Sequence, residues 1–340
     1  MAIVKGAGRW VSLAIISSIL LAASSEARAA EGTSLEVYLG KLGYLGVPFK
    51  VMRDKFQVID GIIAGKHRVL ALDTGCNPSV LGANAARGVK TLGELGISLD
   101  DGRFGVLTNS AIVLIDKLTL GPAQFVNQPA RVENIRMDFA GSPFEGLLGY
   151  DFLCRNSCLM DLGKKQLYVR SKPLSKEQSD ALEKTLAQSR FIPVPTVSSE
   201  ETALDGLLVK AKLNGEETEL LADTGASYTG LDARVANRLK LPIYRQSEIG
   251  SLVPGELRFR AVGVGDVGAH RGKLVTVSSF ELGPRKFKNI HCAVFDFEPW
   301  KKSAKGDPAI NRIQGTLGQE ILSGEGALID VSRGKIWLRP

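Results

Sequence analysis

Hydrophobic residues along this chain occur in short runs and seldom show helical spacing. The runs are rich in β-branched and aromatic residues and end at glycine or at polar residues. Five of them are residues 56–65 (FQVIDGIIAG), 68–73 (RVLALD), 111–121 (AIVLIDKLTLG), 273–283 (KLVTVSSFELG) and 335–339 (KIWLR). Short, turn-bounded runs at close spacing are typical of antiparallel β-structure. The pattern therefore predicts an all-β protein.

Helical signals are few. Within residues 172–195, Ser175 and Gln178 form a capping-box pattern, and Leu182 and Leu186 lie on one helical stripe. We expect this segment to be a helical linker. Shorter helices are expected at residues 82–89, at 231–240 and after each of two Gly-x-x-Gly segments.

The chain contains an internal repeat, and its order predicts two similar lobes. Four blocks recur in the same order: Ile62–Gly75 with Lys212–Gly225, Leu118–Gly121 with Phe280–Gly283, Glu145–Leu153 with Gln314–Leu322, and Leu159–Arg170 with Leu328–Arg339. At 340 residues, the chain is long enough for two domains. The predicted organisation is a signal peptide (1–29), an N-terminal lobe (30–171), the helical linker (172–195) and a C-terminal lobe (196–340).

The first 29 residues have the pattern of a targeting segment. Lys5 and Arg9 precede an apolar run at 11–23, and Ala27-Arg28-Ala29 fits a small-x-small cleavage site. The run is too short to span a bilayer comfortably, so cleavage near Ala29 is favoured over an uncleaved anchor helix. We therefore expect an exported protein, periplasmic or secreted, without a stable membrane anchor after cleavage.

Composition and charge narrow the function classes. The chain is 44% hydrophobic and 23% charged, which is typical of a soluble globular protein. The formal net charge of +7 falls to +5 once the first 29 residues are removed. Lys and Arg form no continuous block interleaved with aromatic residues, so a nucleic-acid partner is not expected. Attraction to acidic peptides or anionic surfaces stays open.

Cysteine and histidine positions indicate no cofactor. The three histidines are scattered, and no cysteine or histidine cluster has zinc spacing, so we expect neither a metal nor another cofactor. Cys154 and Cys158 are four positions apart and form either a disulfide or two thiols, which the sequence does not decide.

The chemistry is carried by a tripeptide that occurs twice, in VLALDTGCNPSVLG (69–82) and in LLADTGASYTGLD (220–232). Both copies could be turns that an Asp side chain caps, without any chemistry. A two-fold arrangement offers more, because Asp73 and Asp223 would then meet across the lobes. Two carboxyl groups about 3 Å apart share one proton, so one can act as a general base while the other polarises a carbonyl group.

This pattern of two apolar residues, Asp-Thr-Gly and a later apolar-apolar-Gly resembles the aspartic peptidases, and most closely the retropepsin-like bacterial aspartyl proteases. The resemblance covers residues 35–340 and implies a closed β-barrel in each lobe, the two related by a pseudo-two-fold axis. It also implies a catalytic pair, Asp73 and Asp223, supported by the residues that follow each of them: Thr74, Gly75, Thr224 and Gly225.

The function expected from this resemblance is that of an aspartic-type endopeptidase, a hydrolase that cleaves peptide bonds with an Asp-activated water. A peptide or protein is the expected substrate, and a monomer the expected state. The alternative is a catalytically silent or partner-specific binding or regulatory protein that keeps the fold. One departure affects the pH behaviour: pepsin-like enzymes often carry a hydroxyl residue directly after the Gly, where this chain has Cys76 and Ala226. We expect activity at less acidic pH than in pepsins.

Overall fold

The computed structural model describes residues 34–52, 55–95, 110–133, 138–139, 142–197, 205–244, 260–261, 270–271, 273–297 and 308–340. The predicted signal peptide, residues 1–29, lies outside them. The chain divides into two compact units, Met1–Tyr44 and Leu45–Pro340. In the first unit, helix α2 (Leu35–Lys41) begins after Ser34, whose side chain accepts a hydrogen bond from the backbone N–H of Val37 at 3.3 Å. The second unit holds both lobes.

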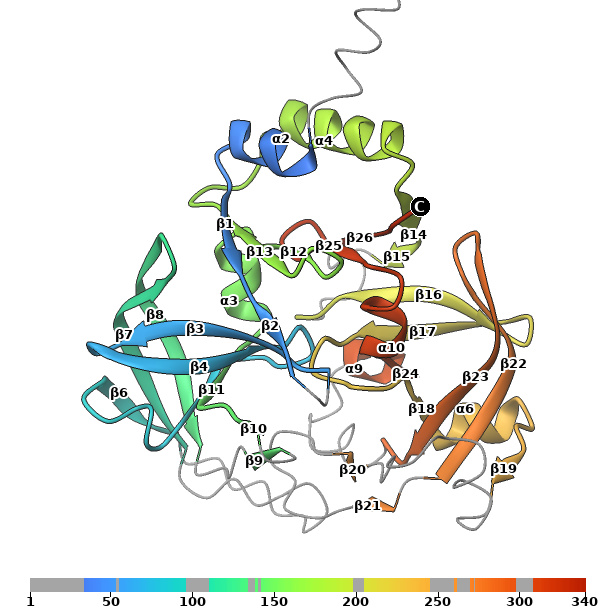
Figure 1. The fold of residues 1–340 in the computed structure, drawn as a ribbon. Coiled ribbons are helices and arrows are strands. Elements are labelled where there is room, and N and C mark those ends of the chain that lie inside the picture. The colour runs from blue at the N-terminus through green and yellow to red at the C-terminus, as the bar shows by residue number, and fades with distance from the viewer. Residues whose placement is uncertain are drawn as a thin grey trace, which may run out of the picture. The chain divides into compact units, whose positions relative to one another are not determined.

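The first lobe is a closed barrel (Figure 1). Its six strands follow one another around the ring in the order β3 (Gln57–Ile63), β4 (Lys66–Leu72), β11 (Gly146–Leu148), β5 (Val80–Gly82), β8 (Ala123–Glu133) and β7 (Ser110–Leu120). Pairing of β3 with β7, from Gly61↔Leu120 to Ile63↔Leu118, closes the ring. Two further strands extend it: β2 (Lys50–Val51) beside β3 and β6 (Lys90–Leu95) beside β7.

The second lobe repeats this barrel strand for strand. The ring runs through β16 (Leu208–Leu213), β17 (Glu216–Ala222), β24 (Gly315–Leu317), β18 (Gly230–Asp232), β23 (Arg285–Phe295) and β22 (Lys273–Leu282). Pairing of β16 with β22 closes it, while β15 (Thr196–Val197) and β19 (Ile243–Tyr244) extend it. The prediction of an all-β fold with two closed-barrel lobes is confirmed.

A six-stranded sheet joins the ends of the two lobes. Its order is β1 (Leu45–Pro48), β13 (Gln166–Val169), β12 (Leu159–Asp161), β25 (Leu328–Asp330), β26 (Lys335–Leu338) and β14 (Ile192–Val194). At its centre β12 and β25, which correspond in the repeat, pair antiparallel from Leu159↔Asp330 to Asp161↔Leu328. The described residues also form two small hairpin pairings, β9 (Asp138–Phe139) with β10 (Ser142–Pro143) and β20 (Arg260–Ala261) with β21 (His270–Arg271).

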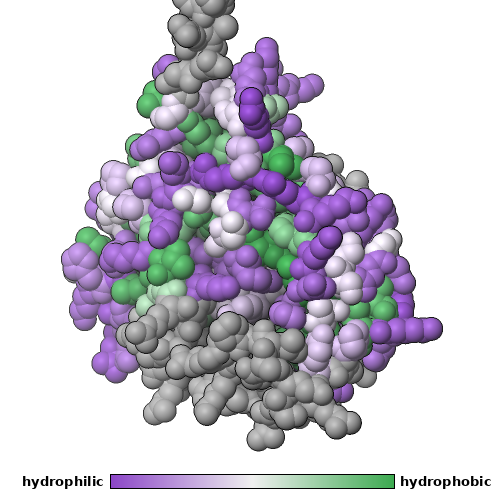
Figure 2. Space-filling model, turned by 45° about the vertical axis from the view of Figure 1, so that its right-hand side comes forward, coloured by the Kyte–Doolittle hydropathy of each residue, from purple (hydrophilic) through white to green (hydrophobic). Residues whose placement is uncertain are grey.

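Alternation along the strands explains where the core lies. In β4, Leu70 and Leu72 point into the first barrel, and their counterparts Leu220 and Ala222 point into the second; all four are fully buried. On the face shown in Figure 2, the described surface is mostly hydrophilic, with hydrophobic residues in small separate groups. Among the described residues, no helix combines the length and the hydrophobicity needed to span a bilayer.

The helices agree with the sequence except at one place. The capping box of Ser175 and Gln178 starts the linker helix α4 (Lys176–Gln188), with Leu182 and Leu186 fully buried. The other helices of unit 2 that the structure describes are α3 (Tyr150–Arg155), α6 (Ala233–Arg238), α9 (Pro308–Arg312) and α10 (Gln319–Leu322).

The helix predicted at residues 82–89 is wrong, because the chain forms successive turns there. Its counterpart in the second lobe is α6, where Asp232 caps the helix by accepting a hydrogen bond from the backbone N–H of Arg234. The corresponding position in the first lobe is Gly82, which has no side chain to serve as a cap.

Candidate active site

Each Asp-Thr-Gly begins where a buried strand ends. Strand β4 ends at Leu72 and β17 at Ala222, so Asp73 and Asp223 take the next positions. Both strands lie parallel to the short strand of the later Gly block, β11 or β24. The backbone N–H of Asp73 donates to Leu148 O at 3.1 Å, and that of Asp223 to Leu317 O at 3.0 Å. The same frame therefore holds both residues.

The glycines allow the two loops to approach each other closely. A Cβ atom placed on Gly75 would lie 2.4 Å from Cγ of Asp223, and one on Gly225 would lie 2.4 Å from Cγ of Asp73. Any larger residue would therefore push the opposite carboxyl group away. Each glycine also donates its backbone N–H to the Asp of its own loop, from Gly75 to Asp73 Oδ1 at 2.9 Å and from Gly225 to Asp223 Oδ1 at 2.8 Å.

The two carboxyl groups form a hydrogen-bonded pair at the junction of the two loops. Burial raises the pKa of Asp73, although the N–H of Gly75 opposes this by stabilising its charged form. Burial also raises the pKa of Asp223, and the negative charge of Asp73 raises it further. Two such groups hold one proton between them over a wide pH range.

Thr74 and Thr224 tie the loops together with four buried hydrogen bonds. The backbone N–H of each threonine donates to the Oγ1 atom of the other at 3.0 Å. Each hydroxyl group then donates across the junction, from Thr74 to Ala222 O at 2.7 Å and from Thr224 to Leu72 O at 2.9 Å. The threonines are 1% and 0% exposed, so water does not compete for these bonds. The structure thus brings together all six predicted site residues of the two loops.

A second layer of residues supports both loops, and the sequence analysis did not predict it. The hydroxyl of Ser79 accepts a hydrogen bond from Gly149 N at 2.9 Å and donates one to Asp151 Oδ1 at 2.7 Å. In the second lobe, Thr229 Oγ1 accepts from Gly318 N at 3.1 Å. Ser79 and Thr229 occupy equivalent positions in the repeat, four residues after Gly75 and Gly225. Extending the alignment of the two loops past the glycines would have identified them.

Cys76 lies beside the pair but does not act on it. Its thiol is 8% exposed and donates to Pro78 O at 3.2 Å, not to a carboxylate oxygen. Burial raises the pKa of Cys76 well above its ordinary value, and the charge of Asp73 raises it further. A thiol with so little thiolate is a poor nucleophile, which agrees with a packing role.

The structure contains no disulfide between Cys154 and Cys158, and both are free thiols. Cys154 lies in the last turn of α3, where its side chain bonds to the hydroxyl of Tyr150. Ser157, with a φ of 46°, then turns the chain so that Cys158 is fully buried and its thiol faces Asn156 O at 3.7 Å. The two sulfur atoms therefore have different partners.

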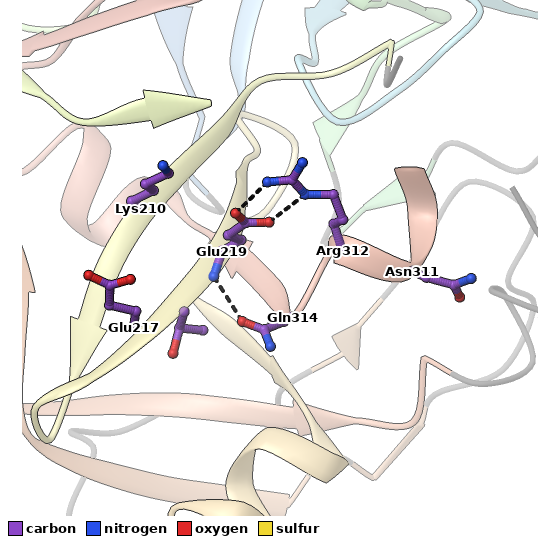
Figure 3. Close-up of a pocket in the computed structure, with 7 residues that line it drawn as sticks. Lys210, Glu217, Glu219, Asn311, Arg312 and Gln314 are labelled. Carbon is purple, nitrogen blue, oxygen red and sulfur yellow. Dashed lines mark hydrogen bonds and ion pairs between the residues drawn. The ribbon is translucent and has the colours of Figure 1, made fainter. Parts of the chain in front are cut away.

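A cavity of about 390 Å³ is lined by residues of β16, β17 and α9 and by Gln314 (Figure 3). Its polar groups largely satisfy one another: Arg312 binds both carboxylate oxygens of Glu219, at 2.9 and 2.7 Å, and Gln314 Oε1 accepts from Glu219 N at 3.0 Å. It contains none of the predicted site residues. Within the described ranges, no group of three or more His, Cys, Asp or Glu residues could hold a metal ion.

Comparison with protein families matches part of the second lobe. Residues 209–321, most of the second lobe, match the family model described as aspartyl protease. One similar solved structure is a retropepsin-like aspartic protease from Rickettsia conorii, with 19% identity, coverage of 37% of this chain and 90% of the other, and a TM-score of 0.25.

Another is the aspartic proteinase from Irpex lacteus, with 13% identity, coverage of 87% and 97%, and a TM-score of 0.46. No curated protein matches the sequence. The family match covers one copy of a lobe that this chain repeats, down to the Asp-Thr-Gly loop and its Gly-bearing partner strand. Residues 209–321 are therefore similar to the aspartyl protease family, and the first lobe repeats the strands and the Asp-Thr-Gly loop of that region.

Proposed function

We propose that this protein is an aspartic endopeptidase that hydrolyses peptide bonds with Asp73 and Asp223. The observation that carries the proposal is the hydrogen-bonded carboxyl pair at the junction of the lobes. A pair of capped turns with a purely structural role would not require two carboxyl groups to share a buried site, because burying them together costs free energy. Paired carboxyl groups with unequal proton affinities are what general acid–base hydrolysis needs.

The pair suggests the following division of roles. One carboxyl group holds the shared proton and donates it toward the carbonyl oxygen of the scissile peptide bond. The other, charged and stabilised by the backbone N–H of the glycine in its own loop, accepts a proton from a water molecule bound between the two carboxyl groups. The water then attacks the carbonyl carbon without a covalent enzyme intermediate. The threonine bonds keep both carboxyl groups in place during the reaction.

The setting of this activity follows from the sequence. The N-terminal pattern of Lys5, Arg9 and an apolar run supports export, to the periplasm or outside the cell. A peptide or protein substrate is proposed because the pair acts on an amide bond. A monomer is proposed because both copies of the loop lie in one chain, so the site needs no second protein.

The test is to incubate the mature protein with a diverse peptide mixture between about pH 3 and 8 and to identify the products by mass spectrometry. Asp73→Asn and Asp223→Asn are compared with the wild type. Asp60→Asn is the matched control, because Asp60 is a surface carboxylate, paired with Lys50 at 2.8 Å. We expect cleavage by the wild type and the control and none by the two dyad variants.

Two results would contradict the proposal. Cleavage that survives either dyad substitution would show that the pair is not the catalyst. A folded wild type without cleavage of any peptide across the pH range would contradict a general endopeptidase and favour the alternative, a partner-specific or silent protein. Thermal unfolding curves of all four proteins show that each is folded.

A further inference from the structure

The layer of side chains behind the carboxyl pair does not follow the repeat. In the aligned Gly blocks, Gln319 of α10 takes the place that Tyr150 has in α3, and Ser323 takes that of Cys154. Where the chain enters each barrel, Gln57 at the start of β3 corresponds to Leu207 directly before β16. One side of the pseudo-two-fold axis therefore carries an amide network, and the other carries an apolar residue, a phenol and a thiol.

Gln319 links the catalytic loop of its own lobe to the other lobe. Its side chain is 1% exposed, and its Nε2 atom donates to Thr224 O at 2.7 Å and also to Oε1 of Gln57. Ser323 Oγ donates to Oε1 of Gln319, which keeps the amide in this orientation. Gln57 is itself fully buried and belongs to β3 of the first barrel.

The acceptor of this bond belongs to a peptide group that acts on the site. The carbonyl of Thr224 and the N–H of Gly225 are parts of one peptide group, and that N–H donates to Asp223 Oδ1 at 2.8 Å. Hydrogen bonds in such a chain polarise one another, so a donor at the carbonyl strengthens the N–H as a donor, by roughly 10–30%. In the first lobe, Tyr150 directs its hydroxyl to the thiol of Cys154 instead.

We propose that Gln319 is a positioning residue that makes the two catalytic loops unequal: through the Thr224–Gly225 peptide it strengthens the hydrogen bond to Asp223 that stabilises the singly charged carboxyl pair. The catalytic role of Gln319 rests on the proposed function, but the pKa shift can be measured whether or not the protein cleaves peptides. Strengthening a charge-assisted hydrogen bond by that fraction corresponds to about 0.1–0.7 pH unit in the lower apparent pKa of the pair.

Other charged groups near this network also influence the pKa values of the pair, so the test must leave them in place. Asp73 faces Asp223 across the junction. Glu320 follows Gln319 in α10, and Lys55, whose Nζ lies 4.4 Å from the ring centroid of Tyr228, acts electrostatically on Glu320. None of them is altered by a substitution at Gln319 or Gln57.

The experiment compares Gln319→Leu with Gln57→Leu. Both variants lose the buried bond between the lobes, but only Gln319→Leu removes the donor to Thr224 O, since Ser323 still orients Gln319 in the other variant. The carboxyl groups of aspartate labelled with ¹³C are titrated by NMR and assigned by difference with Asp73→Asn and Asp223→Asn. The pH dependence of kcat/KM for a cleaved peptide is measured beside them.

We expect Gln319→Leu to raise the lower apparent pKa of the pair, and the acidic limb of the rate profile, by about 0.1–0.7 pH unit, and Gln57→Leu to leave both unchanged. No shift in Gln319→Leu, or equal shifts in the two variants, would overturn the inference. If Gln319→Leu fails to fold, the double variant Gln57→Leu/Gln319→Leu, which orphans neither amide, gives the same test. If no peptide is cleaved, the proposed function fails, but the NMR titration still tests the role of Gln319. The two proposals can therefore be refuted independently.

Discussion

The hydroxyl groups at the lobe junction should contribute a large share of the stability of this protein. Thr224→Val keeps the shape of the side chain but removes Oγ1, which accepts from Thr74 N at 3.0 Å and donates to Leu72 O at 2.9 Å. Both backbone groups are then buried without a partner, at a cost of about 1–3 kcal/mol each. The expected loss is roughly 2–6 kcal/mol, compared with about 5–15 kcal/mol for the unfolding of a typical domain.

The assay is urea unfolding followed by tryptophan fluorescence, with Thr74→Val and the double variant completing a cycle. Each threonine hydroxyl makes two bonds of its own, so the singles should cost similar amounts. The double should cost less than their sum, because the first substitution already loosens the junction. Thr185→Val is the control: its hydroxyl bonds to Ala181 O at 2.9 Å on an exposed face of α4 and should change stability by no more than about 0.5 kcal/mol. A loss below about 1 kcal/mol in Thr224→Val would refute the reasoning.

Three further predictions concern the site and the thiols. Gly75→Ala should abolish peptide cleavage in the assay above, because its Cβ would meet the Asp223 carboxyl at 2.4 Å, whereas Gly93→Ala, with nothing within 4 Å, should retain it. Asp223→Asn should raise the melting temperature at pH 7. The pKa of Asp223 in the folded protein lies above its ordinary 3.8, so the wild type loses stability as the pH rises from 3.8 toward the folded pKa. The difference in melting temperature between the two proteins should therefore vanish near pH 4. Thiol titration in denaturant without reductant should count four free thiols per chain; a count of two would show that Cys154 and Cys158 pair in solution.

Sequence periodicity and the internal repeat predicted the parts of the fold that depend on local pattern. Four of the five short apolar runs became barrel strands and the fifth became β26 of the six-stranded sheet, while the capping box at Ser175 became the start of α4. The repeat also predicted that Asp73 and Asp223 occupy equivalent loops, and the structure places them in contact. The helix predicted at residues 82–89 does not form, because Gly82 stands where the second lobe has the capping residue Asp232. A repeat predicts shared backbone, whereas a cap depends on one side chain.

Contacts that join distant and unrepeated positions could not be predicted in this way. Gln57 and Gln319 are separated by 262 positions and have no counterpart pair in the other half. Neither residue carries a local pattern that marks it as buried, since glutamine is usually exposed. Only the packing of β3 against α10 shows that the two amides satisfy each other, and such packing has no signature in a single sequence.

The presence of both lobes in one chain has a chemical consequence for the site. If two identical chains formed it, every substitution would appear on both sides, and the carboxyl groups would differ only through the bound substrate. In this chain Gln319 can replace Tyr150 on one side alone. The shared frame of strands, glycines and threonines keeps the carboxyl groups together, while the unrepeated layer behind them makes their surroundings differ. Unequal surroundings favour one assignment of acid and base before substrate binds, which is a form of preorganisation that the duplication makes available.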